Sequence, residues 1–157
     1  MEEYDLIEET VSILKEIPGG REVIEWFDGW PSFGDGEVLE IRLVRKGPSY
    51  FRIAALASEA GKRKGPPYKH AVFNFTLRDM VDLCLDGFAH QNVIGQLNLR
   101  RAQDQAVHSS LQGIGLVCGE VEIELEPCAG PIGTIRCNIE KITITPADDY
   151  QEADDIG

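Results

Sequence analysis

Three glutamates in one predicted strand could bind a cation or a basic partner. The alternation in Val121-Glu-Ile-Glu-Leu-Glu126 places Glu122, Glu124 and Glu126 on one strand face, each about 6.5–7 Å from the next. Like charges this close are tolerated where the face meets water or a cationic partner. This acidic strip (Glu122, Glu124 and Glu126) leaves three interpretations open: a solvated face that discourages edge pairing, a docking surface for a basic partner, or part of a calcium site.

A second candidate is the segment Trp30-Pro-Ser-Phe-Gly-Asp-Gly-Glu37, which joins a predicted helix to the first predicted strand. It combines two aromatic residues, Trp30 and Phe33, with two carboxylates, Asp35 and Glu37. In one interpretation the aromatic rings fill the core while Asp35 accepts hydrogen bonds from backbone N–H groups of the loop. In the other, the segment is an exposed recognition loop carried by a rigid scaffold.

The sequence lacks the motifs of common catalytic and metal sites. It contains no GxSxG, P-loop, HExxH or dinucleotide fingerprint, and no CxxC pair. The histidines are His70, His90 and His108, and the cysteines are Cys84, Cys118, Cys128 and Cys137. We expect no cofactor and no metal, and we expect the protein not to be an enzyme. A small enzyme with an assembled Cys/His/Asp site is kept as an alternative, as is a ligand-binding β module.

Composition limits the class of partner. The chain has 157 residues, with 15 Lys+Arg against 27 Asp+Glu and a formal net charge of −12. This charge repels nucleic acid and anionic lipid, whereas it favours encounter with a basic protein. The acidic start MEEYDLIEE is not a signal peptide, and no apolar run approaches the ~18 residues that span a bilayer. We therefore expect a cytoplasmic protein, and a Cys128–Cys137 disulfide, although sterically conceivable across a hairpin, is not expected there.

Two helices are predicted at the start of the chain. Apolar residues recur at three- and four-residue intervals over the first 17 residues, and Pro18-Gly19-Gly20 then ends this helix. A shorter helix is predicted over 21–28. The apolar period then changes to two, which predicts an antiparallel hairpin from strands at 37–43 and 51–55.

Further strands are predicted at 70–76, 81–87, 93–100, 120–126 and 134–145. In the last of these the apolar phase changes, which predicts a β-bulge near Glu140-Lys141. The pattern indicates an α+β fold, with N-terminal helices followed by a mostly antiparallel sheet, flat or curled into a sandwich or half-barrel. We expect one domain over 1–146. The tail 147–157 carries five acids and no base, and we expect it to be disordered.

Four segments in order resemble the immunity protein 50 family of bacterial polymorphic toxin systems. They are IPGGREVIEWFDGWPSFGDGEV (Ile17 to Val38), FNFTLRDMVDLCLDGFAHQNVIGQLNL (Phe73 to Leu99), GEVEIELEP, and GTIRCNIEKITITP (Gly133 to Pro146). The resemblance rests on the order and spacing of these segments and covers about residues 17–146. The chain departs from the family pattern at Gly34, where a histidine is common, which weakens a metal or acid/base interpretation of Asp35 and Glu37 because that histidine would have supplied the nitrogen partner.

The resemblance implies a binding protein that neutralises a cognate toxin without catalysing a reaction. The toxin-binding residues would then be Trp30, Phe33, Asp35 and Glu37, or the acidic strip. The partner would be a toxin with a basic surface. The oligomeric state is left open, because exposed edge strands can pair two copies or be guarded by charge.

Overall fold

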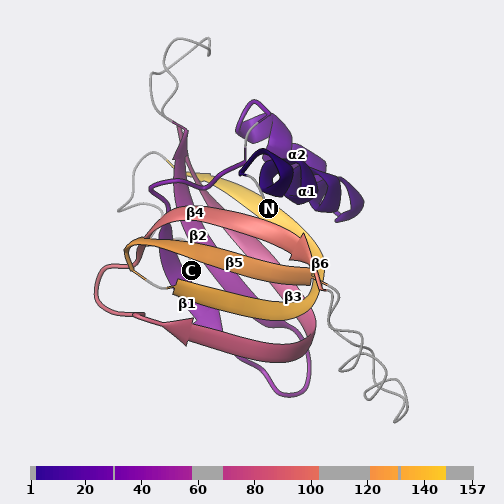
Figure 1. Ribbon diagram of the computed structural model, residues 1–157, viewed down its shortest axis with the longest axis vertical. Coiled ribbons are helices and arrows are strands. Elements are labelled where there is room, and N and C mark those ends of the chain that lie inside the picture. The colour runs from indigo at the N-terminus through magenta and orange to yellow at the C-terminus, as the bar shows by residue number, and fades with distance from the viewer. Residues whose placement is uncertain (1–2, 30, 58–68, 103–120, 131, 148–157) are drawn as a thin grey trace.

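Two helices precede six antiparallel strands in the computed structural model, which describes residues 3–29, 31–57, 69–102, 121–130 and 132–147 (Figure 1). The helices are α1 (Glu3–Glu16) and α2 (Gly20–Trp26). The strands are β1 (Glu37–Arg42), β2 (Ser49–Ala57), β3 (Lys69–Asp86), β4 (Val93–Arg101), β5 (Val121–Ala129) and β6 (Ile132–Ala147). The predicted α+β fold is confirmed. Apart from Ala147, the predicted acidic tail lies outside the described residues.

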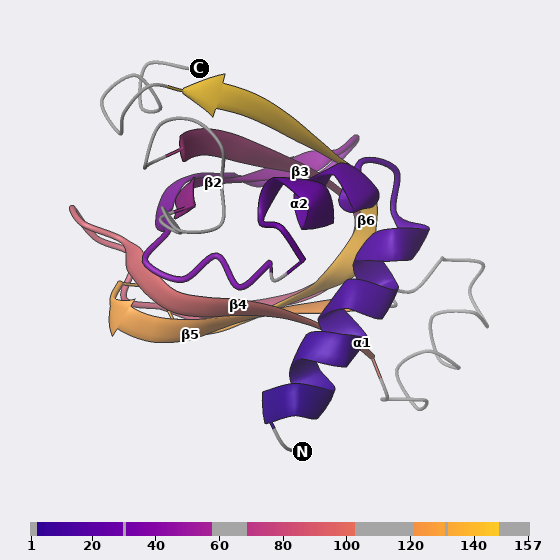
Figure 2. The ribbon, with the colours of Figure 1, turned by 90° about the horizontal axis from the view of Figure 1, so that it is seen from above.

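The strands form a closed barrel in the order β1-β2-β3-β6-β5-β4, so the predicted curling of the sheet is complete. All neighbouring strands are antiparallel, and the long strands β3 and β6 share the most extensive ladder. Seen from above, α2 lies over the opening of the barrel and α1 lies beside it (Figure 2). Neither of the described helices has the length and apolar character needed to cross a membrane.

The connection between the helices is fixed by glycine. Helix α1 ends before Pro18, as predicted, and Gly19 has a φ of 89°, which L side chains rarely adopt. A Cβ atom at Gly19 would overlap the carbonyl oxygen of Ile142 in β6, while the Ile142 N–H donates to the Pro18 carbonyl at 2.9 Å. The turn is therefore attached directly to the barrel.

Strand β3 differs from the prediction of two strands at 70–76 and 81–87. It is one continuous strand in which the ladder shifts between Arg78 and Asp82, so Asp79, Met80 and Val81 form a bulge and not a break. The bulge predicted near Glu140-Lys141 is confirmed, because Thr76 pairs with Lys141 and Leu77 with Ile139. Bulges on both long strands bend the sheet enough for it to close.

Aromatic rings fill the barrel interior. Phe33 is fully buried, and its ring centroid lies 4.8 Å from that of Phe27 and 5.0 Å from that of Phe73. Trp26 of α2 lies 5.1 Å from the same Phe73 ring. The second helix and the segment after it therefore close the barrel by inserting side chains into its core.

Side chains of α1 complete the barrel where β1 and β4 separate. Among the described residues, β1 and β4 share a single register pair, Glu37 with Val93. Farther along β4, the Leu99 N–H donates to the Thr10 hydroxyl at 3.0 Å, and the Arg101 N–H donates to the Glu9 carboxylate at 2.9 Å. Helix α1 thereby satisfies backbone donors that an open strand edge would leave unpaired.

Candidate functional site

The acidic strip lies on the outer face of β5, where β4, β5, the first half of β6 and the second half of β3 are neighbours (Figure 1). Its three glutamates are half-buried, whereas Val121, Ile123 and Leu125 between them are buried in the barrel. The predicted alternation is therefore confirmed. The interpretation as a guarded edge is wrong, because β5 pairs with β4 on one side and with β6 on the other.

One end of the strip is neutralised by a row of alternating charges across four strands. Arg100 lies opposite Glu122, Glu122 opposite Arg136, and Arg136 opposite Asp82. Arg100 also reaches diagonally to Glu124, with an Nη1–Oε2 distance of 3.0 Å. Arg136 is only 8% exposed, so its charge is largely screened from any partner. The charges at this end of the strip are therefore balanced, with two arginines and two acids in one row and one ion pair from Arg100 to Glu124.

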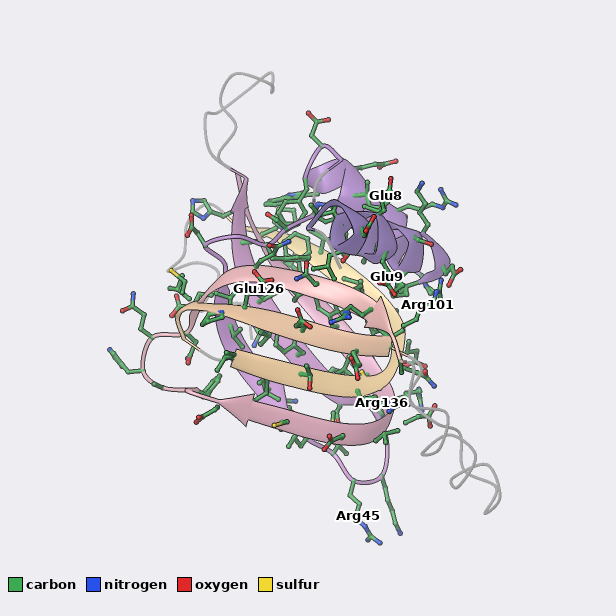
Figure 3. All side chains as sticks on the ribbon, in the orientation of Figure 1. Glu8, Glu9, Arg45, Arg101, Glu126 and Arg136 are labelled. Carbon is green, nitrogen blue, oxygen red and sulfur yellow. The ribbon has the colours of Figure 1, made fainter. Side chains whose placement is uncertain are left out.

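The other end of the strip keeps its negative charge. Glu126 accepts a hydrogen bond from Asn98 Nδ2 at 3.3 Å, and Asn98 in turn accepts one from Gln96 Nε2 at 2.9 Å. Within the described part of the chain, Glu126 has no ion-pair partner. Figure 3 shows Glu126 and Arg136 from neighbouring strands of the same face. An amide neighbour orients the Glu126 carboxylate without cancelling its charge.

Exposed apolar side chains lie beside this free carboxylate. Glu126 and Ile132 each lie one residue beyond the last β5–β6 pair, and Ile132 is registered opposite Asp86 of β3. Phe88 follows Asp86 by two residues. Phe88 and Ile132 are 52% and 48% exposed, so both present apolar surface to the solvent. We call Asp86, Phe88, Glu126 and Ile132 the Glu126 end of the barrel.

The fold places the residues of the candidate segment before β1 in different environments. Phe33 is in the core, so the prediction of an exposed Phe33 in a binding loop is wrong and its structural interpretation is confirmed. Trp30 lies outside the described residues. Glu37 is half-buried at the start of β1. Asp35 is exposed, and its backbone N–H donates to the Ile94 carbonyl of β4 at 3.0 Å.

Of the residues in that segment, Asp35 lies near the acidic strip. Ile94, its backbone partner, is registered opposite Pro127, the residue after Glu126. Asp35 therefore lies one strand away from Glu126, at the same end of the barrel. Phe88 is not among the predicted site residues, and its one signal in the sequence is an aromatic residue in a polar turn after a strand.

The two described histidines lie near opposite ends of β3. His70 lies at the start of β3 and His90 beyond its end, while His108 and Cys118 are outside the described residues. Among the described residues, no group of three or more His, Cys, Asp or Glu side chains could hold a metal ion, which leaves the calcium interpretation of the strip without a ligand set there.

The described cysteines are free. Cys84 and Cys128 are exposed and Cys137 is buried, so Cys128 and Cys137 form no disulfide. Burial and, to a smaller extent, the charge of Asp79 raise the pKa of the Cys137 thiol from 9.0 to about 12. A thiol with so high a pKa is protonated at neutral pH and is a poor nucleophile.

Comparison with known proteins gives no relative for this chain, since no family model, curated protein or solved structure matches it.

Proposed function

We propose that this chain is a cytoplasmic immunity protein, which binds a cognate bacterial toxin with a basic surface and neutralises it without catalysis. The observation that carries the proposal is the Glu126 end, where Asp86 and Glu126 form no ion pair with any described residue and lie beside two exposed apolar residues. The ordered motif resemblance and the net charge of −12 support the same function.

The composition of the Glu126 end suits tight binding of a basic protein. Aromatic residues are frequent hot spots of protein interfaces, and Phe88 offers an anchor that is already half-exposed on a short turn. Carboxylates around such an anchor accelerate encounter with a cationic surface and disfavour acidic partners. Because the neighbouring Arg100–Glu122–Arg136–Asp82 row is already neutralised, a basic partner gains most of its electrostatic attraction at the Glu126 end.

The first test is protection by co-expression. The toxin encoded by the reading frame beside this gene is expressed with the chain, and growth and complex formation are measured. We expect rescue of growth and a stable complex. Absence of binding and of protection against every neighbouring toxin would refute the proposal.

Matched charge reversals test the location of the interface. The variant Asp86→Lys/Glu126→Lys and the control Glu22→Lys/Glu25→Lys each change the net charge from −12 to −8, because each replaces two acids by two lysines. Glu22 and Glu25 are exposed on α2. We expect association to slow by about tenfold or more at low salt for the first variant and only slightly for the control. Equal slowing would mean that bulk charge, and not the Glu126 end, directs binding.

Phe88→Ala separates contact from charge. This change leaves the net charge unaltered and removes an exposed ring, so the fold should be unaffected. We expect faster dissociation of the toxin complex, with the association rate nearly unchanged. Unchanged dissociation would exclude Phe88 from the interface.

A further inference from the structure

A polar hollow of about 220 Å³ lies on the outer surface of the barrel, formed by strands that lie away from the Glu126 end. Its lining comes from four neighbouring strands and includes Glu40 and Arg42 of β1, Tyr50 and Arg52 of β2, Asn74 of β3 and Thr143 of β6. Four of these residues form one row across the sheet, because Glu40 is opposite Arg52, Arg52 opposite Asn74, and Asn74 opposite Thr143.

The hollow carries one positive charge that is not neutralised. Glu40 pairs with Arg42 on its own strand, with an Oε1–Nη2 distance of 3.1 Å, and not with Arg52, which lies opposite it. Arg52 forms no ion pair with any described residue. In a protein with a net charge of −12, an arginine left without a carboxylate marks a place where an anion is favoured.

Two buried atoms of this row also lack hydrogen-bond partners. Arg52 Nη2 and Asn74 Oδ1 are closed off from solvent, and neither has a hydrogen-bond partner among the described residues. Buried polar atoms without partners are rare in folded proteins and destabilise them. One atom is a donor and the other an acceptor, and their residues face each other across β2 and β3. A ligand that satisfies both must therefore present an acceptor to Arg52 and a donor to Asn74.

We propose that this hollow binds a small monocarboxylate that carries a hydroxyl or amine next to the carboxylate. The planar carboxylate matches the fork of the Arg52 guanidinium, and the adjacent O–H or N–H donates to Asn74 Oδ1. The single unneutralised charge favours a monoanion over a phosphate dianion. Binding in this way requires each side chain to rotate so that its buried atom faces the hollow. The volume suits a small organic acid, since it is below that of most drug-sized sites.

The test is a titration of the isotopically labelled full chain, followed by NMR. The probes are glycolate, acetate, which lacks the donor, and inorganic phosphate. We expect saturable shifts of the Asn74 side-chain amide and of the Thr143 backbone amide, with glycolate binding more tightly than acetate and acetate more tightly than phosphate. The absence of saturable shifts with glycolate would overturn the site. Equal binding of glycolate and acetate would overturn the role of Asn74, and tighter binding of phosphate would overturn the choice of a carboxylate.

Two variants with opposite expected effects complete the test. Arg52→Gln should weaken glycolate binding by about tenfold or more, because a charged donor is lost. Glu40→Gln removes the carboxylate that competes for the arginines, and it should strengthen binding. Damage to the fold cannot produce this gain. Unchanged affinity in both variants would overturn the proposal, and because the hollow and the Glu126 end belong to different strand segments, this result leaves toxin binding unaffected.

Discussion

Replacement of Thr10 by valine tests whether α1 completes the barrel. The Thr10 side chain is buried, with 3% of the residue exposed, and its hydroxyl lies 3.0 Å from the Leu99 nitrogen and 2.8 Å from the Leu6 carbonyl oxygen. The hydroxyl thus accepts the Leu99 N–H and donates to Leu6. Valine has nearly the same shape but cannot accept a hydrogen bond, so the buried Leu99 N–H loses its partner.

The expected loss of stability follows from this single unsatisfied donor. Leaving a buried backbone donor without a partner costs about 1–3 kcal/mol. Valine adds no packing contacts that would offset this cost, because its side chain has nearly the same shape as that of threonine. With an m-value of about 2 kcal/mol/M for urea, the unfolding midpoint should fall by about 1 M while the m-value stays the same.

Hydrogen exchange at Leu99 distinguishes the lost bond from a packing defect. Thr10→Ser keeps the hydroxyl and removes a methyl group, which itself costs about 1 kcal/mol. We therefore expect faster exchange of the Leu99 amide than of its β4 neighbours in Thr10→Val, and continued protection in Thr10→Ser. If the valine variant is as stable as the parent and the Leu99 amide stays protected, α1 does not complete this edge.

Further predictions concern the core, the helix connection and the thiols. Phe33→Ala should destabilise the fold by about 3–5 kcal/mol, measured by urea unfolding; a loss below about 1 kcal/mol would contradict its place in the core. Gly19→Ala should destabilise by more than about 1 kcal/mol, because its φ of 89° disfavours a side chain and a Cβ meets β6, and an unchanged thermal midpoint would argue against this contact. Mass mapping after maleimide treatment of the folded protein should find Cys84 and Cys128 modified and Cys137 unmodified, and equal labelling would show that Cys137 is accessible. The Cys137 thiol stays protonated up to pH about 12 in the folded chain but only to about 9.0 in the unfolded chain. Its contribution to the free energy of unfolding should therefore be complete below pH 9 and fall by about 1.4 kcal/mol per pH unit above it, and Cys137→Ala should show a shallower decline.

Local signals in the sequence predicted the elements well where they depend on neighbours along the chain. Pro18 and Gly19 ended the first helix, because one cannot continue it and the other adopts a positive φ. The bulge near Glu140 was visible as a change of apolar phase within one strand. The join of 70–76 to 81–87 was not predictable in this way, because the bulge over Asp79, Met80 and Val81 is defined by pairing with the distant strand β6.

In the candidate site, too, some features are predictable from the sequence and others depend on how the strands pair. Alternation alone placed Glu122, Glu124 and Glu126 on one face, but it could not show which of these charges are neutralised. That outcome depends on Arg100 and Arg136, which strand register brings from β4 and β6. Register between strands is set by the whole barrel, and a shift of one residue would turn these arginines to the opposite face.

The sequence by itself determined the class of fold, the helix ends, the alternating faces of the strands and the acidic character of the surface, because these depend on residues close together in the chain. Tertiary structure decided the closure of the barrel, the burial of Phe33, the convergence of Asp35 with Glu126, and the hollow around Arg52. Each of these depends on pairing between segments tens of residues apart, where packing and register, and not local propensity, determine which side chains meet.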